Sequence, residues 1–94
     1  KTGAALVVDS EGRLAGIFTD GDLRRHIAQG CDILHSHLTD YMTHNPISAS
    51  KDAYAVDVLR IFEKYKIDDL PIVDLDRHLV GCVDIQDLPK MKVM

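Results

Sequence analysis

Hydrophobic residues along this 94-residue chain form short runs that are separated by turn-forming segments. Residues 5–8 are an apolar run rich in β-branched side chains, residues 14–18 form a second apolar run, and residues 9–12 between them are turn formers. This pattern predicts a β-hairpin. A helix is predicted over residues 19–29, and Gly30 is expected to end it.

The same pattern recurs 65 positions later in the chain. Residues 4–23 align without a gap on residues 69–88, with six identities in 20 positions, where roughly one is expected by chance. The identical pairs are Val8/Val73, Asp9/Asp74, Leu14/Leu79, Gly16/Gly81, Asp22/Asp87 and Leu23/Leu88. The second copy therefore predicts strands at residues 70–73 and 79–83, followed by a helix that begins at Asp84.

Only the second copy has an upstream part. Residues 47–49 predict a short strand, and apolar residues at helical spacing then predict a helix that runs to Tyr65. Ser50 is the predicted N-cap of this helix, and Asp52 is expected in its first turn. The first copy has no counterpart of residues 38–65.

The predicted fold is α+β, built from two copies of one unit. Residues 1–30 form a partial first unit that lacks its opening strand and helix, residues 31–37 form a linker, and residues 38–94 form the second unit, in the order strand, helix, strand, strand, helix. The chain opens directly on an apolar strand without a methionine, so we expect it to be a fragment of a longer protein.

Composition narrows the class of protein. The chain is 46% hydrophobic and 28% charged with a net charge of −4, which is typical of a soluble globular domain and unfavourable for nucleic acid, since phosphate neutralisation needs clustered cations. The longest apolar runs are about five residues, too short to span a membrane. Two cysteines far apart form no zinc or disulfide pattern, and we expect a cytoplasmic location with reduced thiols.

These motifs, at these spacings, resemble the cystathionine-β-synthase (CBS) domain. The second copy carries Met42-Thr-His-Asn-Pro46 and Leu70-Pro-Ile-Val-Asp74, and the first carries Val7-Val-Asp9 and Gly16-Ile-Phe-Thr-Asp-Gly-Asp-Leu23. The resemblance covers nearly the whole chain. It implies a tandem CBS pair that forms a homodimer through its helices.

A narrower resemblance rests on Gly16-Ile-Phe-Thr-Asp-Gly-Asp-Leu-Arg-Arg25. This segment is similar to the CBS pair at the C-terminus of arabinose-5-phosphate isomerases, in which a sugar-isomerase (SIS) domain comes first. Those enzymes supply the precursor of 3-deoxy-manno-octulosonate, a sugar of bacterial lipopolysaccharide. The resemblance implies that the parent is such an isomerase and that this fragment is non-catalytic.

Thr19 and Asp22 are the sharpest candidate site. In CBS domains the matching hydroxyl and carboxylate often bind a nucleotide, with the threonine near phosphate and the aspartate on the ribose hydroxyls. A helix start favours an anion, and a carboxylate can accept two hydrogen bonds from a diol. The same spacing also fits a capping box that needs no ligand, and one residue can serve both roles.

The second copy departs from this pattern because Asp84 replaces Thr19, while Asp87 is kept. An extra carboxylate repels phosphate, so we expect the first copy to matter more for a phosphate-bearing ligand. Arg24 and Arg25 follow the first site directly; they could pair with a phosphate or lie on a solvated helix face.

The remaining candidates for the two pockets follow from the family pattern, with a simple turning of the chain as the alternative. In the first pocket they are Thr2, Gly3 and Ala4. In the second they are Ile67, Asp68 and Asp69, with a wall formed by Thr43, Ile47 and Ser48. No metal site and no cofactor are expected, because His35 and His37 have no third ligand nearby. The other histidines, His26, His44 and His78, are expected at the surface. Cys82 is expected as a small core residue.

Two functions compete at this point. The first is a regulatory module that senses a nucleotide or nucleotide-sugar, with feedback by the cytidine monophosphate conjugate of 3-deoxy-manno-octulosonate as its specific form. Asp68, Asp69 and Asp84 make the second pocket unattractive to adenosine triphosphate. The second function is a ligand-free structural module that dimerises and organises the parent enzyme. An independent enzyme is disfavoured, because no nucleophile–base pair is visible in this short chain.

Overall fold

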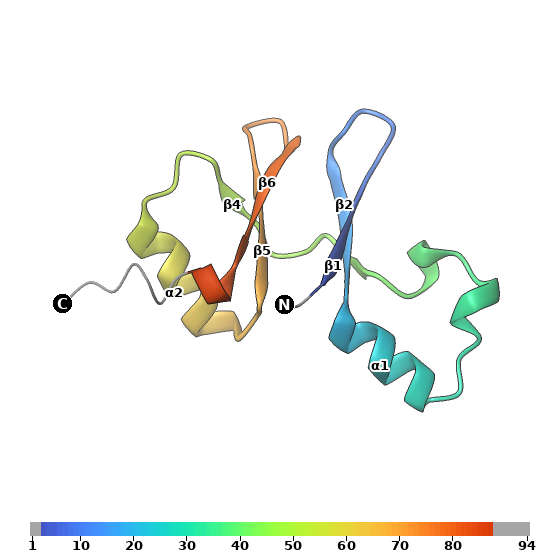
Figure 1. The fold of residues 1–94 in the computed structure, drawn as a ribbon. Helices are drawn as coiled ribbons and strands as arrows, with labels where there is room; N and C mark the ends of the chain where they lie inside the picture. The colour runs from blue at the N-terminus through green and yellow to red at the C-terminus, as the bar shows by residue number, and fades with distance from the viewer. Residues whose placement is uncertain (1–2, 88–94) are drawn as a thin grey trace. The chain divides into compact units, whose positions relative to one another are not determined.

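The computed structural model describes residues 3–87, and contacts divide the chain between Pro46 and Ile47 into two units (Figure 1). In the first unit, β1 (Ala4–Val8) and β2 (Leu14–Thr19) form the predicted hairpin and lead into α1 (Asp20–Ala28). Short 3-10 turns at Ile33–His35 and Leu38–Asp40 follow, and β3 (Thr43–His44) then returns to the sheet. The strand order is β1-β2-β3, with both pairings antiparallel.

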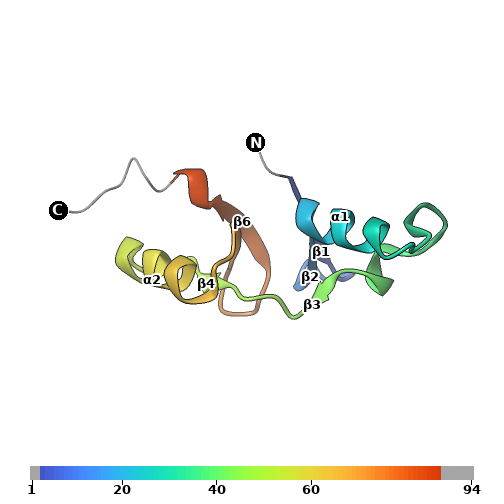
Figure 2. The same ribbon diagram turned by 90° about the horizontal axis from the view of Figure 1, so that it is seen from below.

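The second unit contains β4 (Ala49–Ser50), α2 (Ala55–Tyr65), β5 (Asp69–Val73) and β6 (Leu79–Asp84), and a 3-10 turn at Ile85–Asp87. Its strand order is β4-β5-β6: β4 is parallel to β5, and β6 is antiparallel to β5. α2 connects the two parallel strands and lies beside their sheet (Figure 2). The architecture is the predicted α+β fold, and the first unit opens on its hairpin.

The two hairpins have the same register, which confirms the 65-residue repeat. Ala4 pairs with Thr19 in the first unit, and Asp69 pairs with Asp84 in the second. The register shifts at the same place in both, between Val7/Val8 and between Ile72/Val73. A β-bulge bends and twists the strand that carries it, so the repeated positions specify the same hairpin twice.

The cores of the two units differ in what covers the sheet. Phe62 of α2 packs on Ala49 and Leu70, and Leu70 is completely buried. In the first unit Met42, just before β3, lies over Gly16, where an added Cβ would collide with the Met42 side chain. The close approach of this side chain leaves little room for a Cβ in the middle of β2 unless Met42 shifts.

The predicted boundaries hold in α1 but not at the start of α2. Gly30 follows α1 in the left-handed region, at φ 81°. The prediction of Ser50 as a helix N-cap is wrong, because Ser50 belongs to β4 and pairs with Val73. Its hydroxyl instead accepts a hydrogen bond from Asp52 N, which tightens a turn before the helix. α2 begins at Ala55, so Asp52 is not in its first turn and the predicted strand at 47–49 is displaced to Ala49–Ser50.

The expectation that Cys82 is a core residue is also wrong. Its counterpart in the first unit, Ile17, is buried and pairs with Thr43 of β3. Within residues 3–87 no strand pairs with the outer edge of β6, and the Cys82 side chain is exposed. Partial burial, together with the nearby carboxylate of Asp69, raises the pKa of the Cys82 thiol. The thiol is therefore protonated at neutral pH and is a poor nucleophile.

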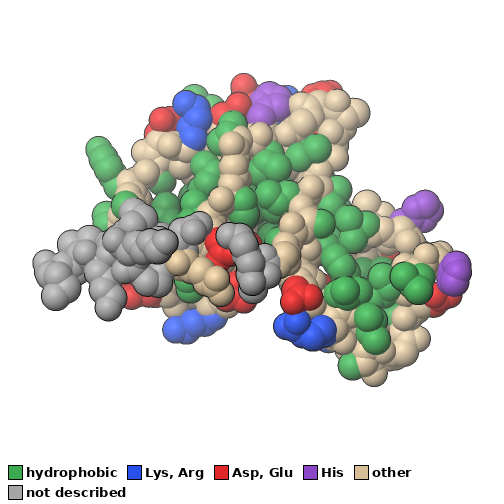
Figure 3. All heavy atoms as spheres, viewed as in Figure 1, with side chains coloured by type: hydrophobic (Ala, Val, Ile, Leu, Met, Phe, Trp, Pro, Cys, Tyr) green, Lys and Arg blue, Asp and Glu red, His purple; other side chains and the backbone are tan. Residues whose placement is uncertain are grey.

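The surface of both units includes large apolar side chains (Figure 3). Leu34 and Leu75 are 93% and 91% exposed, and Tyr54 at the start of α2 is 77% exposed. Conversely, His26 was expected at the surface but is half-buried, with its ring 4.8 Å from that of Tyr41. No helix among the described residues has the length and apolarity needed to cross a membrane.

Candidate functional site

The start of α1 positions the first candidate pair. Thr19 ends β2 and is the N-cap of the helix; its hydroxyl accepts a hydrogen bond from Asp22 N at 3.1 Å. Asp22 Oδ2 accepts one from Thr19 N at 2.9 Å. These reciprocal bonds are the capping box, so the ligand-free interpretation of this spacing is confirmed as a structural role. They also fix the Asp22 carboxylate rigidly against the helix start.

The second oxygen of Asp22 bonds to an arginine. Asp22 Oδ1 accepts a hydrogen bond from Arg25 Nη2 at 2.6 Å, and the Asp22 side chain is only 10% exposed. Burial raises the pKa of Asp22, but hydrogen bonds from the Thr19 N–H and from Arg25 outweigh it and hold the pKa below its ordinary value of 3.8. Asp22 is therefore an ionised carboxylate at neutral pH, as a diol-binding group must be.

The structure brings further predicted residues beside this pair. Gly3 O accepts a hydrogen bond from Asp20 N at 3.1 Å, and Ala4 pairs with Thr19 across the hairpin. The backbone of Gly3 and Ala4 thus borders the start of α1 and adds no charge. Arg24 instead forms an ion pair with Asp20 at 2.7 Å, with 71% of its side chain exposed.

The second unit has the same backbone arrangement with different charge. Ile85 N donates to Asp68 O at 2.8 Å, which repeats the bond at Gly3, and Asp69 pairs with Asp84. Asp84 is buried and accepts a hydrogen bond from Gln86 N at 2.8 Å. Asp68, Asp69 and Asp84 therefore place carboxyl groups at three positions that are Gly3, Ala4 and Thr19 in the first unit.

The remaining predicted residues are distributed more widely. Thr43 lies in β3 and pairs with Ile17, so it belongs to the first unit, whereas Ile47 and Ser48 belong to the second. Ile67 packs against the core around Leu70. Thr2 and the side chain of Asp87 lie outside the described residues.

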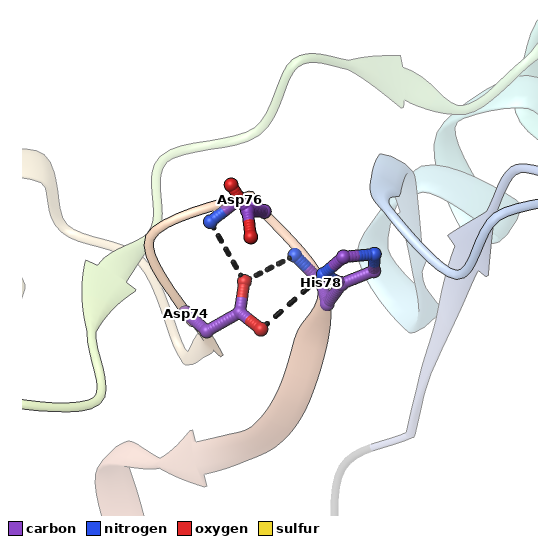
Figure 4. Close-up of side chains that lie close together, drawn as sticks. All are labelled: Asp74, Asp76 and His78. Atoms are coloured by element: carbon purple, nitrogen blue, oxygen red, sulfur yellow. Dashed lines mark hydrogen bonds and ion pairs between the residues drawn. The ribbon is translucent and has the colours of Figure 1, made fainter.

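A cluster that the sequence analysis missed lies at the tip of the second hairpin (Figure 4). Asp74, Asp76 and His78 place potential metal ligands within 4.8 Å of one another. Asp74 Oδ1 accepts hydrogen bonds from Asp76 N and His78 N, each at 2.9 Å, and Asp74 Oδ2 lies 3.2 Å from His78 Nδ1. These bonds hold the pKa of Asp74 below its ordinary value, with the His78 N–H as the largest cause.

The first hairpin explains this cluster as a turn. Asp9 Oδ1 accepts the equivalent hydrogen bonds, from Glu11 N at 2.8 Å and Arg13 N at 3.0 Å. There, arginine occupies the position of His78, and a cation cannot be a metal ligand. An aspartate that bonds to its own backbone is a common way to hold a turn, so the cluster needs no metal. The D-x-D-x-H spacing in the sequence is the signal that could have located it.

Comparisons with known proteins bear on these sites. The family model described as the CBS domain matches residues 1–29 and 38–90. The chain is 39% identical over 92 residues to the arabinose 5-phosphate isomerase KdsD of Pseudomonas aeruginosa, which covers 98% of this chain and 28% of that protein. It is 38% identical over 91 residues to the protein of the same name from Francisella tularensis, covering 97% of this chain and 28% of the relative. The chain thus spans about 28% of the length of these relatives.

A solved structure with a similar fold carries ligands. The CBS domain pair of protein MJ0100, in complex with 5'-methylthioadenosine and S-adenosyl-L-methionine, superposes with a TM-score of 0.82. It is 32% identical in sequence, and the match covers 94% of this chain and 68% of that one.

Proposed function

Because this chain belongs to the CBS domain family, as its motifs predicted, we propose that it is a regulatory module that binds a nucleotide or nucleotide-sugar. The observation that carries the proposal is the buried, ionised Asp22 carboxylate, fixed beside Thr19 at the start of α1. A carboxylate in this setting can accept hydrogen bonds from a ribose diol, and a helix start favours a phosphate. The similar MJ0100 pair, with two nucleosides bound, supports a ligand of this class.

The first unit is proposed as the main site for a phosphate-bearing ligand. Gly3 and Ala4 add no carboxylate to that of Asp22 beside Thr19, whereas Asp69 and Asp84 would repel a phosphate in the second unit. Arg25 supplies a cation next to the site. Arg24 is engaged with Asp20 and is a weaker candidate.

The proposal extends to the parent protein. The chain is a non-catalytic region of a longer arabinose 5-phosphate isomerase with an N-terminal SIS domain, in keeping with its relatives of this name. Its regulatory ligand is then the cytidine monophosphate conjugate of 3-deoxy-manno-octulosonate, acting as end-product feedback on lipopolysaccharide synthesis in the cytoplasm. A ligand regulates by binding one conformation of the enzyme better than another.

A ligand-free structural module remains the second candidate. It is favoured by the exposed apolar side chains of α2, where Val56 is 48% exposed and Tyr65 is 45% exposed. Replacement of Thr19 by Asp84 in the second copy also weakens the case for a ligand there. In this alternative the chain forms a homodimer through its helices and organises the parent enzyme.

Isothermal titration calorimetry on the 94-residue chain tests the proposal. The ligands are the cytidine conjugate, adenosine monophosphate and adenosine triphosphate, titrated separately. We expect one of them to bind, and Asp22→Asn to weaken it about tenfold or more, the scale of hydrogen bonds to a charged group. Binding of an adenine nucleotide alone would exclude the feedback ligand, and binding of none, together with a dimer in solution, would favour the structural module.

A further inference from the structure

Arg25 bonds to the oxygen of Asp22 that the helix cap leaves available to a ribose. Asp22 Oδ2 is held by the Thr19 N–H at 2.9 Å as part of the helix cap. Asp22 Oδ1 is the other acceptor, and Arg25 Nη2 lies 2.6 Å from it. A diol that binds the carboxylate therefore meets Arg25 first, because displacing the Thr19 bond would also undo the start of α1.

The ion pair between these residues can be replaced by a ligand. The Arg25 side chain is 55% exposed, whereas the Asp22 side chain is 10% exposed. Arg25 thus reaches the carboxylate from the solvent side. Ion pairs with an exposed partner contribute little to stability, since water screens them and the long side chain loses freedom. The guanidinium can therefore leave Asp22 while the carboxylate stays in place.

We propose that Arg25 is a specificity-determining residue that selects phosphate-bearing nucleotides over neutral nucleosides. When a nucleotide binds, its ribose hydroxyls take Asp22 Oδ1, and the released guanidinium pairs with the phosphate beside Thr19. Guanidinium and phosphate form bidentate, charge-assisted hydrogen bonds. A nucleoside offers no anion, so it loses the Arg25–Asp22 ion pair without a replacement. This inference rests on the proposed function, because it assigns a role within the same site.

The test is Arg25→Gln, which keeps much of the side chain and removes the charge. Adenosine, adenosine monophosphate, cytidine and cytidine monophosphate are titrated against the original and variant 94-residue chains by calorimetry or, for weak binders, by NMR. We expect the nucleosides to bind about three- to fivefold more tightly to the variant. We expect the monophosphates to bind about tenfold less tightly. Opposite changes for the two ligand types would not follow from a merely structural role of Arg25.

The second unit provides a matched control. Arg60 lies 4.0 Å from Asp57 with the same three-residue spacing, and Asp57 Oδ2 accepts from Tyr54 N at the start of α2. Arg60→Gln makes the same charge change in the same kind of pair, at a helix start without a candidate site. It should change the affinity for nucleosides and monophosphates by less than twofold.

The outcomes separate this inference from the proposed function. In one outcome, monophosphates bind and Asp22→Asn weakens their binding, but Arg25→Gln changes the affinities for both ligand types in the same direction or changes neither. The role of Arg25 is then refuted and the proposed function stands. If neither ligand type binds the original chain but the cytidine conjugate does, the inference fails and the proposed function stands. If the cytidine conjugate and adenosine triphosphate do not bind either, or if binding does not depend on Asp22, both fail. If Arg60→Gln reproduces the opposite changes, they arise from net charge and the inference is overturned.

Discussion

The two hairpins of this chain share their backbone geometry and differ at the end where a ligand would bind. Both have the same register and bulge, and both close on an aspartate that accepts two backbone N–H groups, Asp9 in one and Asp74 in the other. At the opposite end Ala4 faces Thr19 in the first unit, whereas Asp69 faces Asp84 in the second. Hydrogen bonding of the turn and ladder is thus preserved while the charge beside the helix start changes. The proposed sites of the two units would therefore differ in charge although the backbones of their hairpins match.

The hairpins also differ in what covers them. In the first hairpin, Met42 and β3 cover β2 at Gly16. In the second hairpin, α2 buries Leu70 of β5. At Gly81 of β6, no atom among residues 3–87 lies within 4 Å of an added Cβ. Each unit therefore depends on a different part of its repeat for stability. The following substitutions test that difference.

The largest effect is expected at Leu70, whose counterpart in the first unit is the exposed Ala5. Leu70→Ala removes a completely buried side chain from the contact with Phe62 and should lower the free energy of unfolding by about 2–5 kcal/mol. Urea denaturation followed by circular dichroism measures this. Leu75→Ala, at a 91% exposed position, is the control and should change it by less than about 0.5 kcal/mol. If Leu70→Ala is unfolded, Leu70→Val should lose about 1 kcal/mol, and a negligible loss there would contradict this description of the core.

The paired glycines give the next effect. Gly16→Ala forces its Cβ against the buried Met42 side chain and should cost about 1–3 kcal/mol, the range for overpacking. Gly81→Ala meets no atom within 4 Å and should be nearly neutral. The same denaturation experiment compares the two variants. If both variants lose the same free energy of unfolding, packing of Met42 on β2 does not make the two hairpins different in stability.

Asp22 should give the first helix a dependence on pH. The pKa of Asp22 is lowered in the folded chain, so ionisation of this carboxyl stabilises the fold above its unfolded pKa of about 4, and the stabilisation disappears as pH falls through the lower folded value. Asp22→Asn should lower the free energy of unfolding by about 1 kcal/mol at pH 7. The difference from the original chain should shrink below about pH 4 in denaturation curves.

Asp57 is the matched residue at the start of α2, with longer bonds of 3.4 Å to Tyr54 N and 4.0 Å to Arg60. Asp57→Asn should lower the free energy of unfolding at pH 7 by at most about 0.5 kcal/mol, which is less than the loss expected for Asp22→Asn. An equal or larger cost at Asp57 would show that the short bonds of the first site do not set its stability.

Effects of opposite sign are expected at the tips of the hairpins. Gly12 and Arg77 occupy equivalent positions with φ of 83° and 69°. A side chain is disfavoured in this left-handed region, so Arg77→Gly should stabilise the chain by about 0.5 kcal/mol, after the added freedom of the unfolded glycine is subtracted. Gly12→Ala should destabilise it by about 1 kcal/mol. Thermal unfolding of the two variants tests whether their stability changes have opposite signs. A loss of stability in Arg77→Gly would contradict backbone strain at Arg77.

The sequence by itself determined the repeat, the hairpins and the capped start of α1. Their signals are local: alternating runs and turn formers specify a hairpin, and the spacing of Thr19 and Asp22 fits a capping box at the helix turn that they begin. The motifs also determined the family. These predictions required no knowledge of what packs against each element.

Tertiary structure decided the features that depend on distant partners. Ser50 has the chemistry of an N-cap, but pairing with Val73 drew it into a strand and moved the start of α2 to Ala55. Cys82 and Ile17 occupy the same repeat position, yet Cys82 is exposed and Ile17 is buried. Among residues 3–87, β3 pairs with β2 beside Ile17, and no strand pairs with the outer edge of β6. Arg25 could have faced solvent or Asp22, and its 2.6 Å bond is set by the rotamers of both side chains. Spacing along the chain restricts which groups can meet, whereas packing and pairing decide which of them do.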